Sequence, residues 1–94
     1  MIVSYRDRRT ERFAQGEPIR AFSGFSRQAE ARLDRLEAAA SLQDLRALPG
    51  NRLEMLRGNR AGQYSIRIND QWRICFEWPE VAPGPSNVEI VDYH

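Results

Sequence analysis

The sequence contains no lysine, one cysteine and one histidine, and these scarcities exclude several classes of protein. Cys75 alone cannot form an internal disulfide, which suits a reducing cytoplasm. One histidine and one cysteine are too few for a zinc site. No apolar run approaches the roughly 20 residues of a membrane span, and the start MIVSYRDRRT lacks the apolar core of a signal peptide. We therefore expect a cytoplasmic protein with no membrane contact, metal or cofactor.

The overall composition is that of one globular domain. The chain has 94 residues, of which 41% are hydrophobic and 29% charged, so it can fold around a small core of its own. No internal repeat, low-complexity tract or domain boundary interrupts it. We predict a single domain over residues 1–94.

Positive charge is carried by arginine alone and is concentrated in the middle of the chain. All 14 cationic side chains are arginine, and the net charge is +1. Residues 1–45 carry a net charge of +1, residues 46–73 of +4 and residues 74–94 of −4. A GC-rich genome would explain the lack of lysine. Phosphate binding would explain it equally well, because the planar guanidinium pairs with phosphate better than an ammonium does.

The hydrophobic period changes from that of helices to that of strands near Pro49-Gly50. Residues 2–5 read as a first strand, residues 7–15 as a helix, and Ser26 as the cap of a second helix. A shorter helical stretch follows over residues 41–48. The buried stripe of the second helix is predicted to comprise Ala29, Leu33, Leu36 and Ala40.

Four strands and one loop make up the second half of the chain. The strands are predicted over residues 52–56, 63–69, 71–78 and 87–93, and the loop over residues 79–86. The fold class is then α+β: an N-terminal strand and two to three helices pack on one face of an antiparallel sheet. The other face of such a sheet is commonly left to solvent.

The register of the central hairpin can be predicted from its apolar residues. A two-residue loop would pair Ile66 with Arg73 and mix the two faces of the sheet. A three-residue loop at residues 69–71 instead keeps all apolar residues on one face. That register places Arg67 opposite Arg73 on the open face, with Ser65 opposite Cys75.

Two like charges directly opposite each other are destabilising, so the arginine pair requires an explanation. In one interpretation both side chains point apart into solvent, where salt screens their repulsion. In the other, an anion normally lies between them. Arg57 and Arg60 of the loop LRGNRAG would then join Arg67 and Arg73 on one side of the sheet. Such a basic concavity is typical of nucleic-acid binding.

The stretch LPGNRLEMLRGNRAGQYSIRINDQWRICFEW, together with the terminal VEIVDYH, closely resembles the HigB toxins, a branch of the RelE-like superfamily. The similarity runs through most of the chain and departs from the family at residues 14–25 and in a longer loop, PEVAPGPSN. The resemblance implies the compact α+β fold of RelE-like toxins. It also implies a ribosome-dependent mRNA endonuclease (an mRNA interferase) that cuts messages in the A site of the 30S subunit. Its partner would be a helix-turn-helix antitoxin, HigA-like, whose complex with the toxin binds operator DNA.

The resemblance also implies which residues form the site. The arginine of the QWR motif falls on Arg73, and the terminal DYH motif on Asp92, Tyr93 and His94. The basic residue of the family's L-[KR]-G loop falls on Arg57. Some members use a lysine near the end of the first helix, for which Arg20 is a loose substitute. Apart from the resemblance, Arg67 or Arg57 is expected to hold flanking phosphates beside Arg73, and Arg60 is a further candidate for RNA binding.

Cleavage of RNA without a metal requires a base for the 2′-OH, a stabilised phosphorane and an acid for the 5′-oxygen. With an ordinary pKa near 6.5, His94 suits general acid or base catalysis, and Asp92 would orient its ring. Arg73 would stabilise the charge of the transition state. The products would be a 2′,3′-cyclic phosphate and a 5′-hydroxyl.

Some residues retain a second interpretation. Tyr93 would either stack on a base or close the end of the sheet. Trp72 and Trp78 share the predicted buried face, so we expect them in the core and not as platforms for RNA. A catalytically silent module of the same fold, acting with its antitoxin as a DNA-binding repressor, is the alternative function. Retention of both Arg73 and His94 favours the nuclease.

Overall fold

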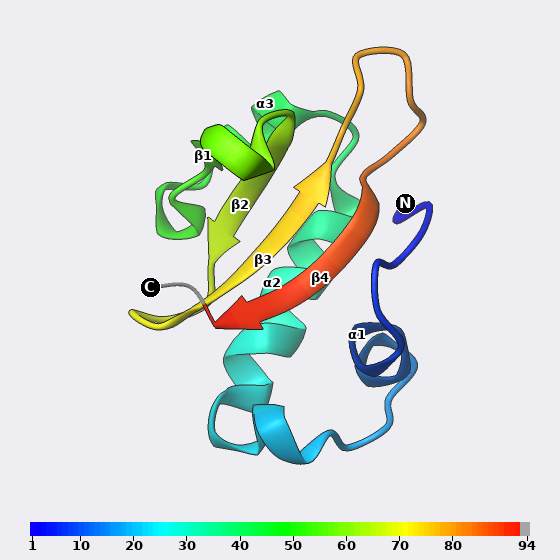
Figure 1. Cartoon of the computed structure of the whole chain (residues 1–94), viewed down its shortest axis with the longest axis vertical. Helices are drawn as coiled ribbons and strands as arrows, with labels where there is room; N and C mark the ends of the chain where they lie inside the picture. Colours follow the sequence, from blue (N-terminus) through cyan, green and yellow to red (C-terminus); the bar gives the residue numbers. More distant parts are fainter. Residues whose placement is uncertain (93–94) are drawn as a thin grey trace.

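The computed structural model describes residues 1–92 of the chain. Within this range, four antiparallel strands form one sheet in the order β1-β2-β3-β4, with α2 crossing behind it and α1 beside β4 (Figure 1). The predicted α+β architecture is therefore confirmed, and none of the described helices is long and apolar enough to cross a membrane. The strands are β1 (Glu54–Met55), β2 (Gln63–Arg67), β3 (Trp72–Glu77) and β4 (Ser86–Asp92). The α-helices are α1 (Arg8–Ala14), α2 (Ser26–Ala38) and α3 (Leu42–Arg46), and the 3₁₀ helices are η1 (Arg20–Phe25), η2 (Pro49–Asn51) and η3 (Gly58–Arg60).

The central hairpin has the register that the sequence predicts. Ile66 pairs with Ile74, and Arg67 pairs with Arg73. The turn is held by Asn69, whose side-chain oxygen accepts hydrogen bonds at 2.8 Å from the backbone N–H groups of both Gln71 and Trp72. Short polar side chains favour turns through such local bonds, and here the bond fixes which face each strand residue occupies.

The N-terminal segment is less regular than the strand expected over residues 2–5. Only Tyr5 forms a bridge, parallel to Val88 of β4. The N–H of Val3 donates to the carbonyl of Pro85 at 2.7 Å, so the segment still lies along β4. A continuous ladder is interrupted because Pro85 has no N–H and Asn87 adopts a φ of +51°. The segment covers the outer edge of β4 without becoming a full strand.

Helix α1 begins where the sequence predicts and is tied to the sheet. Asp7 caps it by accepting a hydrogen bond at 3.1 Å from the N–H of Thr10. Thr10 is fully buried, and its hydroxyl accepts a hydrogen bond at 3.0 Å from the N–H of Ile90 in β4. A polar side chain of α1 thus satisfies a backbone group of the sheet edge.

Two details of α2 differ from the sequence-based prediction. Ser26 does not cap the helix: it is the first helical residue, and η1 runs directly into it. Ala39, not Ala40, continues the buried stripe. The helix ends at Ala38, and Ala39 has an extended backbone, so helical spacing no longer determines which side chain faces the core.

The core lies between the sheet and the helices. Trp78 is 7% exposed, and Trp72 packs against Phe22 and Phe25 with ring centroids 5.8 and 4.8 Å apart. Both tryptophans therefore belong to the core side of the sheet, as the alternation in β3 predicts. The fully buried core side chains include Phe22, Leu36, Ile66, Ile74, Phe76, Val88 and Ile90.

The opposite face of the sheet is not open to solvent as expected. Ser65 and Cys75 do lie opposite each other there, but both are fully buried. Arg60, at the end of η3, lies over this face and contacts Glu89 of β4 at 3.0 Å. Arg6 approaches the same carboxylate from the N-terminal segment at 3.5 Å. Charged side chains, and not a layer of helices, cover this part of the sheet.

Candidate functional site

Arg67 and Arg73 face each other across β2 and β3, and each also contacts a carboxylate. Arg67 forms an ion pair with Asp70 across the hairpin turn. A nitrogen of Arg73 lies 3.7 Å from Glu54 of β1. The attraction to these acids offsets the repulsion between the two arginines. Each member of the opposed pair therefore has a carboxylate beside it, and solvent screening is not the only effect that offsets the repulsion.

The two arginines are positioned by strand alternation and are largely covered. The Arg73 side chain is 17% exposed and that of Arg67 30%. Behind them, the guanidinium of Arg32 in α2 donates to the carbonyl of Arg67 at 2.9 Å. Burial, followed by the charges of Arg35 and Arg67, lowers the pKa of Arg32. A third arginine thus anchors the backbone of the hairpin from the helix side.

Glu54 is a site residue that sequence reasoning misses. It pairs with Ser65 across β1 and β2, and the register of β2 and β3 then brings it diagonally next to Arg73. Its side chain is 52% exposed, so the carboxylate reaches both solvent and the arginine. The alternation of RLEML in the sequence does predict that Glu54 lies on a strand, but it does not predict which residue of β2 it pairs with. The register of β1 could not be read because η3 interrupts the connection to β2.

Arg60, predicted from the loop as a fourth arginine of the site, contacts a glutamine and a glutamate on the same face of the sheet. Its guanidinium donates hydrogen bonds at 3.0 Å to both Gln63 and Glu89. Arg6 completes this network through Glu77, at 3.0 Å. Arg60 therefore closes the sheet face above Cys75, one row of residues away from Arg67 and Arg73.

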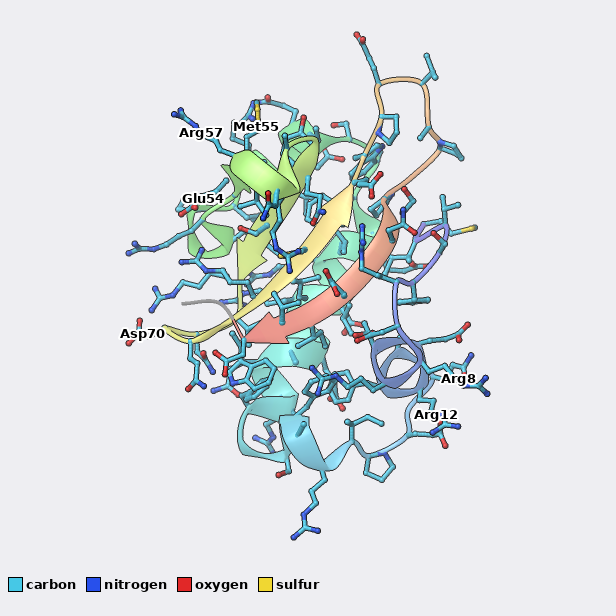
Figure 2. All side chains as sticks on the ribbon, viewed as in Figure 1. Arg8, Arg12, Glu54, Met55, Arg57 and Asp70 are labelled. Carbon is cyan, nitrogen blue, oxygen red and sulfur yellow. The ribbon has the colours of Figure 1, made fainter. Side chains whose placement is uncertain are left out.

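Arg57 lies on the exposed side of the same edge. Figure 2 shows Glu54, Met55 and Arg57 close together at the β1 edge, with Asp70 at the tip of the hairpin. Arg57 is exposed, and no ion pair of Arg57 is found among residues 1–92. Its charge is available to a ligand that approaches this edge.

Arg20 is not brought to this face. It is the first residue of η1, whose aromatic residues Phe22 and Phe25 pack against the core side of Trp72. The side chain of Arg73 points to the other side of β3, because successive strand residues alternate. A contact of Arg20 with the same phosphate as Arg73 is not supported by this arrangement.

The C-terminal part of the predicted site is described only as far as Asp92. Asp92 pairs with Trp72, the neighbour of Arg73 in β3, and accepts a hydrogen bond at 2.9 Å from the side-chain amide of Gln71. The last strand therefore ends beside the arginine pair. Tyr93 and His94 lie outside the described residues.

The nearby thiol is chemically protected. Burial raises the pKa of the Cys75 thiol to about 11, so the nucleophilic thiolate is scarce at neutral pH. Within residues 1–92 no group of histidine, cysteine, aspartate or glutamate side chains could hold a metal ion. The described part of the site thus offers guanidinium groups, which suit phosphate binding, together with carboxylates that compete with phosphate for them.

Comparison with known protein families gives a match over nearly the whole chain. Residues 3–94 match the model of the RelE-like toxin of type II toxin–antitoxin system HigB. The curated Toxin HigB-1 of Vibrio cholerae serotype O1 is 36% identical over 80 residues, which cover 83% of this chain and 84% of that protein. An uncharacterized protein of Haemophilus influenzae is 38% identical over 47 residues, or 50% of this chain and 46% of its own length.

A solved structure shares the fold. The YoeB/ParE toxin from Agrobacterium tumefaciens aligns with a TM-score of 0.53 over 99% of this chain and 97% of its own. The sequences are 18% identical, so the likeness concerns the arrangement of helices and strands. It confirms that the helices and the four-stranded sheet adopt the RelE-like toxin fold.

Proposed function

This chain belongs to the RelE-like HigB toxins of type II toxin–antitoxin systems, and on that premise we propose that it is an endoribonuclease that cuts messenger RNA on the ribosome. The proposed nuclease is a single cytoplasmic domain over residues 1–94. It enters the A site of the 30S subunit, and a helix-turn-helix antitoxin, HigA-like, inhibits it. The complex with this antitoxin binds operator DNA.

The observation that carries the proposal is the opposed pair Arg67 and Arg73, with replaceable acids on both sides. The Asp70 side chain is 97% exposed and that of Glu54 52%. A phosphate that enters between the arginines can displace these carboxylates into water at little cost, because exposed ion pairs contribute little to stability. The folded chain thus places two arginines at paired positions of β2 and β3, from which they can bind neighbouring phosphates of one RNA.

The site supplies groups for each requirement of metal-independent cleavage. Arg73 stabilises the charge of the phosphorane, and Arg67 holds the adjacent phosphate. Glu54, once the phosphate has released it from Arg73, stays beside the phosphate and accepts the proton of the 2′-OH, whose oxygen attacks the phosphorus. His94 donates a proton to the departing 5′-oxygen, with Asp92 orienting its ring and Tyr93 stacking on a base. The products are a 2′,3′-cyclic phosphate and a 5′-hydroxyl.

The remaining arginines have separate roles in this proposal. Arg57, exposed at the β1 edge, contacts the RNA backbone beside the scissile phosphate. Arg60 mainly stabilises the fold, because its guanidinium donates hydrogen bonds to Gln63 and Glu89. Its positive charge also attracts RNA to this face of the sheet. Arg20 lies on the helix side, so its RNA contact would be with ribosomal RNA and not with the cleaved message.

The test is to add the purified protein to a translating extract and map new 5′ ends of messenger RNA. We expect cuts in phase with codons that require ongoing translation. Arg73→Ala should lower the cleavage rate about 10²–10³-fold, as loss of a transition-state donor does. Glu54→Gln and deletion of His94 should each lower it about 10²–10⁴-fold, the range for general acid–base groups. Arg8→Ala is the matched control, because Arg8 is exposed on α1 and points away from the sheet (Figure 2).

Two outcomes would contradict the proposal. If Arg73→Ala cleaved at the parental rate, the site would be assigned to the wrong face of the sheet. If a well-folded parent made no cuts in a translating extract, the repressor module without catalysis would be the better conclusion. In that case the opposed arginines would serve only as a clamp for phosphate.

A further inference from the structure

The helix side of the molecule contains a hollow with a chemistry opposite to that of the arginine face. A cavity of about 280 Å³ lies between the N-terminal segment, α1 and α2. Its apolar wall includes Ile2, Phe13 and Leu33. Its polar wall consists of three acidic side chains, Glu30, Asp34 and Glu37.

A second hollow continues the first and makes it a groove. This second cavity, of about 220 Å³, shares Phe13 and Glu30 with the first and extends to Pro18 and Ile19, at the connection between α1 and η1. We call the two cavities together the α1–α2 groove. Cavities of this size each accept one or two side chains of a partner, because a whole small ligand needs roughly 300–1,000 Å³.

The acids of the groove result from a separation of charge on α2. Glu30, Asp34 and Glu37 are spaced four and three residues apart, so they lie on one side of the helix. Arg32 and Arg35 instead bond to the carbonyl of Arg67 and the side chain of Asn51, toward the sheet and η2. Arg32 and Arg35 therefore bind groups toward the sheet and η2 and do not neutralise the acids of the groove.

The acids of the groove have few partners of their own. Glu30 and Asp34 are exposed, and among residues 1–92 neither forms an ion pair. Glu37 accepts a hydrogen bond from the N–H of Ile2 at 2.7 Å. Burial, then the charge of Glu37 and that of Glu11, raises the pKa of Tyr5, which lines the same cavity. Negative charge thus gathers around an apolar floor.

We propose that the α1–α2 groove is the docking site for a basic, amphipathic segment of the antitoxin. An arginine or lysine of that segment would pair with Glu30 and Asp34, and an apolar neighbour would pack on Phe13 and Leu33. RNA is excluded as the occupant, because its phosphates would be repelled by the acids. The proposal rests on the toxin–antitoxin part of the proposed function and is independent of its ribonuclease part.

This location has a consequence for inhibition. The groove is on the helix side of the sheet, and Arg67 and Arg73 are on the other side. A segment bound in the groove therefore does not fill the space between the two arginines. The antitoxin would be anchored at a distance from Arg67 and Arg73 and would inhibit by the bulk of its remaining domain, not by filling the site between them.

The test is the affinity between the toxin and the antitoxin encoded beside it, measured by isothermal titration. Asp34→Arg, and the double variant Glu30→Arg with Asp34→Arg, should weaken the affinity at least about tenfold, because a repulsive charge then meets the basic segment. Glu80→Arg is the matched control: it reverses an exposed acid in the loop after β3 and should bind like the parent. Neutral Glu30→Gln with Asp34→Asn should reduce the salt dependence of binding.

Growth assays separate this inference from the nuclease proposal. Both reversed variants should remain as toxic as the parent when expressed alone, and the antitoxin should no longer protect cells from them. Parental affinity in the double variant would overturn the inference, whether or not the protein cleaves RNA. A parent that forms a dimer which Asp34→Arg dissociates would also overturn it, since the groove would then hold a second copy of the chain.

Discussion

At the scale of single residues, the pair Arg67 and Arg73 shows how a β-sheet accommodates an unfavourable contact. Two like charges directly opposite each other destabilise a strand pair, by up to about 1 kcal/mol. Asp70 supplies a negative charge from the turn and Glu54 from an edge strand. Both side chains are exposed, so neither carboxylate has to be buried in the core. The repulsion is thus offset by acids that can leave when a ligand arrives.

Removing one of these acids gives a prediction for stability. Asp70→Asn removes the carboxylate that pairs with Arg67, so the repulsion between Arg67 and Arg73 is no longer offset there. The free energy of unfolding should fall by a few tenths to about 1 kcal/mol, the usual range for exposed ion pairs. Adding Arg67→Thr to this variant removes the repulsion and should recover most of the loss. Urea titrations of the parent, both single variants and the double variant measure the coupling.

The same variants should differ in RNA binding. Asp70→Asn frees Arg67 for phosphate and should bind a short single-stranded RNA more tightly than the parent at low salt. Arg67→Thr should bind more weakly, with a smaller dependence of affinity on salt, because fewer counterions are released. Equal affinities for all four proteins would show that RNA does not enter between the arginines.

The opposed arginines could be predicted from the sequence, and their acidic neighbours could not. Alternation of apolar residues in two strands joined by a short turn fixes the register, and the register fixes which arginines meet. Asp70 reaches Arg67 through the geometry of the turn, and Glu54 reaches Arg73 diagonally across a third strand. Neither contact follows from spacing along the chain.

At the scale of secondary-structure elements, α1 is joined to the sheet by one buried hydroxyl. Thr10 satisfies the N–H of Ile90 at the β4 edge, a group that would otherwise lack a partner inside the protein. The same helix forms one wall of the α1–α2 groove through Phe13. The position of α1, and with it the shape of the groove, therefore depends on this hydrogen bond.

Thr10→Val tests that connection. Valine has nearly the same shape but no acceptor, so the buried N–H of Ile90 loses its partner and the free energy of unfolding should fall by about 1–3 kcal/mol. Thr10→Ser keeps the acceptor and loses only a methyl group, so it should cost less, about 1 kcal/mol. Chemical denaturation compares them. A larger loss for serine than for valine would show that packing, and not the hydrogen bond, holds α1.

Elements that depend on local sequence were predicted well, and those set by tertiary contacts were not. The caps Asp7 and Ser41 and the alternation of β2 and β3 are local signals, and the corresponding elements form as expected. The strand over residues 2–5 is reduced to one bridge because its partner is interrupted at Pro85 and Asn87. The 3₁₀ helix before α2 removed the cap expected at Ser26.

At the scale of the whole molecule, the two faces of the sheet are covered by different means. Helices and aromatic side chains cover one face, and a network of Arg6, Arg60, Glu77 and Glu89 covers part of the other. Cys75 is buried under this network, and burial raises its pKa from near 9 to about 11. Stability should therefore depend on pH in the alkaline range.

The direction of this dependence follows from the proton balance. Between pH 9 and 11 the thiol ionises in the unfolded chain but stays protonated in the folded one, so the native state binds more protons and stability falls as the pH rises. The total effect is on the order of 2–3 kcal/mol. Tyr5, whose pKa is also raised, adds to the loss above pH 10.

Urea unfolding of the parent and of Cys75→Ala at pH 7, 9 and 10.5 checks this prediction. The parent should lose more stability across this range than the variant, which has no thiol to titrate. The alanine variant starts from a lower value because it leaves a small cavity, so only the slopes are compared. Parallel curves would mean that the thiol reaches water more easily than its position in the fold indicates.

The three-residue turn of the β2–β3 hairpin also constrains how genes for this toxin can change. Inserting or deleting one codon at Asp70 would shift β3 by one residue against β2 and exchange its two faces. Arg73 would then point into the core, and Ile74 would point toward the site. The loop between β3 and β4 carries no such constraint, since Val81 at its tip is 96% exposed. Among homologous reading frames, differences in length should therefore gather in this loop and be absent from the turn.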